Sequence, residues 1–356
     1  MTKKIFIRDL STKADVDTLF LVKYMAVQTD KVGKKYLNLV LADASGDLES
    51  RSWNGAEEIA SRVAKGDYVH VQGKINMFQG RKQLIVQQVS KVDGAGLDPA
   101  DYSMKSSHDA EGMYDALLGL VGELTDAYVR ELLRRVLTDS VIAPRLKTWQ
   151  AGKTIHHAYQ SGLLEHVLSC SRLAMQLSAH YGVNVNYVVA GTVLHDLCKV
   201  HELTEGPSVE YTDEGKLVGH LVKGVEMVEA FAAGIPGFPD DLKMHLKHVL
   251  LSHHGEYAYG SPKIPQTSEA FLVHLIDLMD SKMNSMEMIR KTDTMPGVWS
   301  GFVKHLDRVV YKPELPFYPE MLGAKPSAPS PSKEGTPAPK VGSLGKLLEG
   351  FKPAGD

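Results

Sequence analysis

The hydrophobic pattern of this chain changes its period part-way along, and this change limits the folds that the chain can adopt. Within residues 17–92, short segments are apolar at every second residue, as at Leu37, Leu39 and Leu41. Such alternation is typical of a strand that buries one face. From about Met113 onwards, apolar residues recur at steps of three and four, as in a helix with one buried face. The pattern therefore predicts a β domain followed by an all-α domain.

Five strand-like segments and one helical segment make up the first domain. The helical segment, GAEEIASRVAKG at 55–66, has Ile59 and Val63 four residues apart and lies between the third and fourth strands. A turn at Gly80 separates the last two strands. This order is that of the OB-fold, a small Greek-key barrel that binds oligonucleotides. We therefore expect residues 1–92 to form an N-terminal all-β OB-fold barrel that binds nucleic acid.

The rest of the chain divides by composition. Residues 93–110 are rich in Gly, Ser, Asp and Pro and are expected to form a linker. The helical pattern predicts an all-α domain over 111–320. Residues 321–356 are Pro-rich and cannot bury a core, so they are predicted to be disordered, although 341–353 could form a short helix.

Charge and cysteine content restrict the class of protein. The formal net charge is −3, but residues 1–92 carry 15 Lys and Arg against 10 Asp and Glu, which leaves a net charge of −8 for the remainder. This modest basic excess lies in the predicted barrel. Two cysteines argue against a disulfide-stabilised secreted fold and favour a reducing cytoplasm. No apolar run of about 18 residues predicts a membrane span.

The histidines are distributed unevenly. All but three of the 15 lie between His156 and His274. His195 and Asp196 are adjacent at the end of an apolar segment, and Asp277 lies inside another apolar segment, where a carboxylate is costly to bury without a cation or hydrogen bonds. A set of imidazoles and carboxylates without thiolates suits Mn²⁺, Fe²⁺, Co²⁺ or Zn²⁺. Cys170 and Cys198 lack zinc-site spacing and are expected in the core.

The order of these groups resembles that of a known superfamily. LLEH, LHDLCK, GHL, LSHHG and HLIDLMDSK, in this order, resemble the HD superfamily of metal-dependent phosphohydrolases. The resemblance implies that the first His, the His-Asp pair and the distal Asp of that superfamily are His166, His195–Asp196 and Asp277. His220 and the pair His253–His254 resemble the extended set of two-metal members, whereas the Gly-Tyr-Pro signature of the cyclic-dinucleotide branch is missing.

A narrower resemblance covers about residues 17–310. HHAYQSGLLEHV, YTDEGKLVGH and LSHHGEYAYGSPK, preceded by an OB-like barrel, resemble the YhaM family of 3′-to-5′ exoribonucleases. This resemblance implies a metal-dependent phosphodiesterase that degrades single-stranded RNA, with single-stranded DNA as a further substrate, to nucleoside 5′-monophosphates. Two alternatives stay open: a nucleotide or cyclic-dinucleotide phosphohydrolase with a regulatory barrel, and a non-catalytic RNA-binding protein. The oligomeric state is not predicted.

The resemblance also implies how two ions are held. Manganese is the expected ion, and Fe²⁺, Co²⁺, Mg²⁺ or Zn²⁺ are alternatives. Asp196 is expected to bridge the ions, and Asp280 replaces Asp277 if the helix phase differs. The first ion is assigned to His166, His195, Asp196 and Asp277; the second ion is assigned to His220, His253, His254 and Asp196.

Several further residues are expected to act on the substrate. Asp196 and Lys199 are the predicted catalytic residues, since Lys199 could hold a phosphate oxygen. Lys153, His156 and His157 are predicted phosphate contacts, and the resemblance adds weight to His157, although all three could equally cap a helix. Lys263, after Ser261, could contact the nucleic-acid backbone.

The predicted barrel has aromatic residues suited to stacking on bases. Tyr36, Trp53 and Phe78 are the candidates, with basic residues nearby in sequence, among them Arg51. Trp53 and Phe78 could instead plug the ends of the barrel, and Phe20 is expected in its core.

Overall fold

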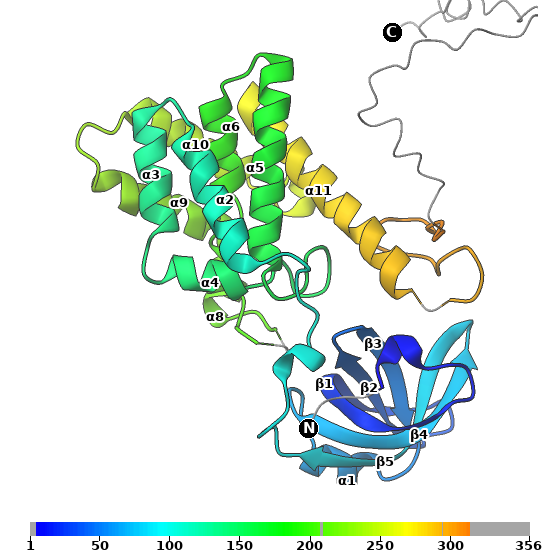
Figure 1. Cartoon of the computed structure of the whole chain (residues 1–356). Helices are drawn as coiled ribbons and strands as arrows, with labels where there is room; N and C mark the ends of the chain where they lie inside the picture. Colours follow the sequence, from blue (N-terminus) through cyan, green and yellow to red (C-terminus); the bar gives the residue numbers. More distant parts are fainter. Residues whose placement is uncertain (1–4, 207–208, 294, 314–356) are drawn as a thin grey trace, which may run out of the picture. The chain divides into compact units, whose positions relative to one another are not determined.

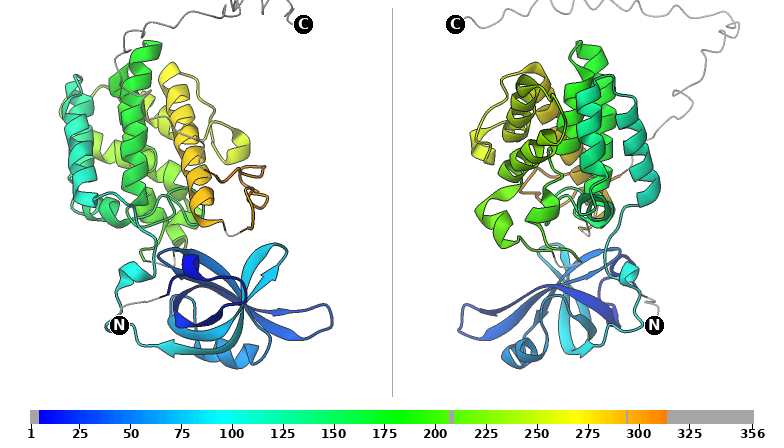
Figure 2. Two further views of the ribbon diagram at one scale, coloured as in Figure 1. Left: turned by 45° about the vertical axis from the view of Figure 1, so that its right-hand side comes forward. Right: turned by 90° about the vertical axis from the view of Figure 1, so that its left-hand side faces the viewer.

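A computed structural model describes residues 5–206, 209–293 and 295–313. The predicted disordered tail at 321–356, with its apolar segment 341–353, lies outside these residues. Figure 1 shows a β-rich part near the N-terminus and a helical part that follows it, and both views in Figure 2 show the same division. Among the described residues, no helix is both long enough and apolar enough to cross a lipid bilayer.

The N-terminal part is a closed five-stranded barrel, as the sequence predicts. Its strands are arranged in the order β1-β2-β3-β5-β4. Antiparallel pairs join all neighbours except β3 and β5, which pair in parallel and close the barrel. Helix α1 lies between the third and fourth strands in the chain. The elements are β1 (Asp15–Thr29), β2 (Lys35–Asp43), β3 (Gly46–Ser52), α1 (Ala56–Arg62), β4 (Tyr68–Phe78) and β5 (Arg81–Val92).

Alternation along the strands explains the core of the barrel. Leu37, Leu39 and Leu41 on β2 are all buried, because every second side chain of a strand points to the same face. Phe20 is also completely buried, as expected. Trp53 and Phe78 are absent from the group of buried residues that fills the barrel. They therefore lie outside the core of the barrel.

The second part is helical, as the sequence predicts. Beyond isolated bridges, its described residues contain no strand. The sequence pattern does not predict the short helices α4 and α8. The helices are α2 (Ala110–Gly122), α3 (Ala127–Leu137), α4 (Ile142–Thr148), α5 (Gly162–Tyr181), α6 (Val185–Leu194), α7 (Lys199–Glu202), α8 (Asp213–Leu217), α9 (Gly219–Ala233), α10 (Asp240–Ser252) and α11 (Ser268–Thr292).

Helix α6 lies at the centre of the helical part. It packs against α5, α10 and α11, and Figure 1 shows α5 and α6 side by side. A Cβ at Gly191 would lie 2.7 Å from side-chain atoms of Val249 and Val273, so only glycine permits this close packing. The end of α6, which carries His195, is thereby buried among three other helices.

The helical pattern of residues 185–200 is interrupted in the structure. Residues 195–198 form a turn between α6 and α7. The Nδ1 atom of His195 lies 2.9 Å from the carbonyl oxygen of Thr192, which the backbone N–H of Asp196 would contact in a continuous helix. Competition of a side chain for a backbone carbonyl accounts for the break. The turn places His195 and Asp196 at the junction of two helices.

Candidate metal centre and nucleic-acid surface

The seven side chains predicted to hold metal come together from five helices or their ends. One ligand atom from each of His166, His195 and Asp277 lies within 4.8 Å of the other two. The same holds for His220, His253 and His254. The side chains are His166 on α5, His195 and Asp196 after α6, His220 on α9, His253 and His254 after α10, and Asp277 on α11. Residues more than 100 positions apart in sequence therefore form one cluster.

Asp196 lies between the two groups. Its Oδ2 atom is 3.6 Å from the Nε2 atoms of both His166 and His195. Its Oδ1 atom is 3.5 Å from Nε2 of His220 and 3.7 Å from Nε2 of His253. One carboxylate oxygen thus faces each group, which is the arrangement that a bridging carboxylate needs.

Three buried atoms of this cluster test whether a cation fits. Oδ1 of Asp196, Nε2 of His220 and Nε2 of His253 have no hydrogen-bond partner in the part of the chain that the structure describes. Buried polar atoms are rarely left in this state, because the loss of water contacts is unfavourable without a replacement. A divalent cation would satisfy all three atoms. The residues present therefore fit a metal centre.

The opposite ring nitrogens determine which atom of each histidine is available. In all five rings Nδ1 contacts a protein oxygen at hydrogen-bond distance, and donation from Nδ1 leaves the lone pair of Nε2 free. The five acceptors are Asp280 for His166 (2.7 Å), Thr192 O for His195 (2.9 Å), Glu202 for His220 (3.0 Å), Leu250 O for His253 (2.8 Å) and Tyr259 O for His254 (3.1 Å). Five lone pairs are consequently available as ligands.

The adjacent histidines lie where α10 ends. His253 caps the helix, and His254 is followed by Gly255 with a φ of 81°. A Cβ at Gly255 would lie 2.1 Å from Cε1 of His274, so the ring of His274 packs directly over this glycine. The turn at the helix end lets both imidazoles lie beside His220 although they follow each other in sequence. The centroids of the His253 and His254 rings are 4.4 Å apart.

Two carboxylates that support the cluster were not assigned this role from the sequence. Glu202, three residues after Lys199, holds Nδ1 of His220. Asp280, expected only as a substitute ligand, accepts hydrogen bonds from His157 (2.8 Å) and His166 (2.7 Å). His157, His166 and Asp280 also lie close enough together to hold an ion. Their short contacts are hydrogen bonds, however, and these bonds orient the ring of His166.

Glu202→Gln is expected to weaken binding of the second Mn²⁺ about 10- to 100-fold, because His220 loses its charged acceptor. Isothermal titration calorimetry would resolve a tight and a weakened site. Glu226→Gln, at an exposed carboxylate on α9, is the matched control and should leave both sites unchanged. Equal affinities in wild type and Glu202→Gln would show that Glu202 does not support a metal ligand.

The electrostatics of the cluster keep Asp196 ionised. Burial alone would raise the pKa of its carboxyl group, but Lys199 and the neighbouring histidines hold that pKa well below the usual range. Nζ of Lys199 donates to Oδ2 of Asp196 at 2.6 Å. Burial alone would lower the pKa of Lys199, but the neighbouring carboxylate of Asp196 raises the pKa of Lys199 above its usual value. A negatively charged Asp196 is the form that can coordinate a cation.

The other predicted substrate contacts differ in their surroundings. Lys153 forms an ion pair with Glu210 at 2.5 Å. His157 is buried with both ring nitrogens bonded to protein groups. Ser261 is buried and donates to two carbonyl oxygens, one of them from the exposed Lys263. Substrate contact at Lys153, His157 and Lys263 stays a prediction.

The predicted stacking residues of the barrel surround one arginine. The ring centroids of Tyr36 and Trp53 are 4.9 Å apart. The guanidinium carbon of Arg51 lies 5.4 Å from the centroid of Tyr36, 5.8 Å from Trp53 and 5.1 Å from Phe78. Phe78 is 44% exposed. We call Tyr36, Arg51, Trp53 and Phe78 the aromatic patch.

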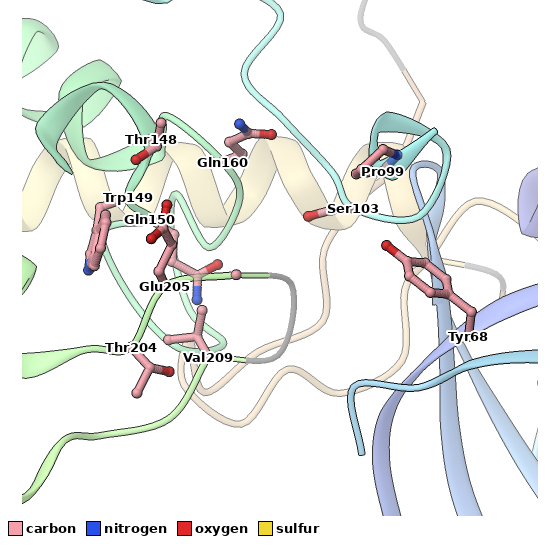
Figure 3. Close-up of a pocket in the computed structure, with 11 residues that line it drawn as sticks. Tyr68, Pro99, Ser103, Thr148, Trp149, Gln150, Gln160, Thr204, Glu205 and Val209 are labelled. Carbon is pink, nitrogen blue, oxygen red and sulfur yellow. The ribbon is translucent and has the colours of Figure 1, made fainter. Parts of the chain in front are cut away.

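A pocket outside the cluster does not share its residues. Its volume is about 220 Å³, and Figure 3 shows Trp149, Thr204 and Tyr68 among the 11 residues that line it. None of those 11 residues belongs to the seven clustered side chains. We therefore place the candidate catalytic site at the cluster.

Comparisons with known proteins agree with this division. A model of the HD domain matches residues 163–282, and a model described as an OB-fold nucleic acid binding domain matches residues 22–92. All seven clustered side chains lie in the first range, and the aromatic patch lies in the second. The second domain of this chain is thus an HD domain of the metal-dependent phosphodiesterase type.

A relative from Listeria monocytogenes serotype 4b (strain CLIP80459), named 3′-5′ exoribonuclease YhaM, is 36% identical over 308 residues, which are 86% of this chain and 97% of the relative. The chain belongs to the YhaM family. Another YhaM, from Oceanobacillus iheyensis, is 31% identical and matches 85% of this chain and 95% of its own. Among solved structures, an OB-fold domain of replication protein A from Methanococcus maripaludis matches 26% of this YhaM family member at 21% identity, with a TM-score of 0.22.

Proposed function

We propose that this protein is a metal-dependent 3′-to-5′ exoribonuclease that hydrolyses single-stranded RNA to nucleoside 5′-monophosphates. The observation that carries the proposal is the orientation of four histidine Nε2 atoms around the two oxygens of Asp196, with His254 grouped beside His220 and His253. The names of the YhaM relatives supply the RNA substrate and the direction of degradation.

The seven clustered residues would hold two divalent ions, with Mn²⁺ as the first choice. His166, His195 and Asp277 would bind one ion, His220, His253 and His254 would bind the other, and Asp196 would contact both. Such a pair lowers the pKa of bound water and neutralises charge on the attacking and leaving oxygens of a phosphodiester.

Protein groups beside the cluster have their own tasks. Lys199 fixes the orientation of Asp196 through the contact between Nζ and Oδ2. Its ammonium also lies where a substrate phosphate oxygen would need a positive partner. Asp280 and Glu202 keep the rings of His166 and His220 turned so that Nε2 faces the cluster. The chain thus prearranges the site before substrate arrives.

The aromatic patch is proposed to capture the RNA strand. Bases stack on aromatic rings regardless of their identity, and a nearby guanidinium attracts the backbone phosphates. Nε of Arg51 is buried and lacks a hydrogen-bond partner within the described ranges, so the neighbouring rings hold its guanidinium. Single-stranded DNA could stack in the same way and is proposed as a further substrate.

The proposal is tested with Mn²⁺-loaded protein and RNA carrying a label at its 5′ end. We expect a ladder of products shortened stepwise from the 3′ end, and nucleoside 5′-monophosphates in the soluble fraction. The same preparation is incubated with cyclic dinucleotides. Hydrolysis of cyclic dinucleotides without shortening of RNA would instead support the small-molecule phosphohydrolase, and inactivity on both would support a binding protein.

A further inference from the structure

The loop before α5 carries an unusual backbone conformation. His156 has a φ of 31° and His157 a φ of 46°. Residues with a Cβ rarely adopt the left-handed region, and two such residues in succession persist only where their surroundings hold them. Conformations of this kind gather at functional sites.

His157 is the residue by which the loop is anchored. Its backbone N–H donates to Oδ1 of Asn284 at 2.7 Å, and its carbonyl oxygen accepts from the N–H of Ala151 at 3.1 Å. Its ring contacts Oδ2 of Asp280 through Nε2 (2.8 Å) and the hydroxyl of Tyr159 through Nδ1 (2.9 Å). No polar group of His157 is left for a substrate.

The next helix is shaped to admit this anchor. A Cβ at Gly162, the first residue of α5, would lie 2.1 Å from the carbonyl oxygen of His157. Glycine therefore allows the loop to lie against the start of the helix that carries His166. The backbone of His157 is enclosed by α5 on one side and bonded to Asn284 of α11 on the other.

His156 is held differently from its neighbour. Its ring lies nearly parallel to the ring of His166, at an interplanar angle of 14° and a centroid distance of 5.7 Å. Its Nδ1 atom is buried and has no hydrogen-bond partner among the residues that the structure describes. Because it stacks on His166, a candidate metal ligand, this ring lies beside the metal-binding cluster.

We propose that His156 contacts a non-bridging oxygen of the scissile phosphodiester, and that His157 is the positioning residue that holds it there. This inference rests on the proposed function, because it concerns the substrate of the same site. The sequence predicts both histidines as phosphate contacts and favours His157, whereas the structure favours His156. The unbonded nitrogen belongs to His156, whereas both ring nitrogens of His157 are used within the protein.

The surroundings favour a phosphate oxygen over a base or a ribose. The ammonium of Lys199, which is bonded to Asp196, and any cations in the cluster would draw the negatively charged oxygens of the substrate to the cluster, beside which the ring of His156 lies. A hydrogen bond from an imidazole N–H to a charged oxygen is stronger than one to a neutral group. A base, by contrast, would need a stacking partner, and one face of the His156 ring is already covered by His166.

The test uses two substitutions and two substrates. His156→Phe keeps a ring that can stack on His166 but removes both nitrogens, and His156→Gly removes the ring and relieves the positive φ. Each is assayed with Mn²⁺ on single-stranded RNA and on bis(p-nitrophenyl) phosphate, which has a phosphodiester but no base or ribose. We expect kcat/KM to fall about 10- to 100-fold on both substrates in both variants, the loss typical of a hydrogen bond to a charged group.

Each other outcome is decisive. Wild-type rates in His156→Phe would overturn the hydrogen bond, and a loss on RNA alone would move the contact to the nucleoside. Loss of one Mn²⁺ per chain, measured by metal analysis, would make His156 a metal ligand instead. Failure of the wild type to shorten RNA would refute the proposed function, whereas an active wild type with unaffected variants would refute this inference. His180→Ala, at an exposed histidine of α5, is the control.

The positioning role of His157 is tested through Asn284. Asn284→Ala removes the acceptor of the His157 N–H and is expected to lower kcat/KM about tenfold on both substrates. Because Asn284 would act through His156, the double variant Asn284→Ala/His156→Phe should be no slower than His156→Phe alone. Additive losses in this cycle, or an unchanged rate in Asn284→Ala, would overturn the positioning role.

Discussion

Asp196→Asn is expected to lower kcat for RNA hydrolysis by about three orders of magnitude or more, a loss of about 4 kcal/mol of transition-state stabilisation. The amide keeps the size of the side chain but lacks the charge that would hold two cations, and both groups of ligands face this one carboxylate. Single-turnover assays with Mn²⁺ would measure kcat, and fluorescence anisotropy with labelled RNA should give an unchanged Kd, because the barrel is untouched.

The control for this substitution concerns Lys199, which would lose its buried partner. Removal of one member of a buried ion pair can destabilise a fold by about 3–5 kcal/mol. Thermal unfolding therefore accompanies the assay, and Asp196→Asn/Lys199→Met removes both charges if the single variant unfolds. A folded variant that retains more than a tenth of the wild-type kcat would contradict the bridging role of Asp196.

Trp53→Ala is expected to raise the Kd for a single-stranded RNA of about 20 nucleotides by 5- to 150-fold, which corresponds to about 1–3 kcal/mol for one stacked base. Trp53 is the residue of choice because its ring contacts both Tyr36 and the guanidinium of Arg51. Cleavage of a dinucleotide should change by less than about twofold, since a substrate that short does not need the capture surface.

Tyr181→Ala is the matched control for the aromatic patch, because Tyr181 is an exposed aromatic residue of the helical domain. Its Kd for RNA should equal that of the wild type. If Trp53→Ala binds RNA normally, or if it slows the cleavage of dinucleotides as much as that of long RNA, the patch does not capture the strand.

The order of the strands and helices could be predicted because the apolar residues of each domain recur at one characteristic spacing. Burial of Leu37, Leu39 and Leu41 follows directly from alternation. The break between α6 and α7 could not be predicted in the same way. It depends on the ring of His195 meeting the carbonyl of Thr192, a contact that no period encodes.

The clustering of the seven candidate ligands could be predicted because their order along the chain resembles that of a known superfamily. Their supporting contacts could not, since Glu202 and Asp280 are ordinary helical carboxylates in the sequence. Only the folded chain reveals that Asp280 lies beside His166 rather than in the cluster. The preference for His156 over His157 as the phosphate contact was hidden for a similar reason, because adjacent identical residues differ only in their backbone surroundings.

Oδ2 of Asp280 accepts from two imidazoles at once, one in the metal cluster and one in the loop. A shared acceptor makes the two arrangements interdependent: a shift of α11 by a fraction of an ångström would disturb both together. Natural selection therefore cannot retune ion affinity and the placement of the scissile bond independently through this residue. A substitution at Asp280 would therefore disturb the candidate metal centre and the loop before α5 together.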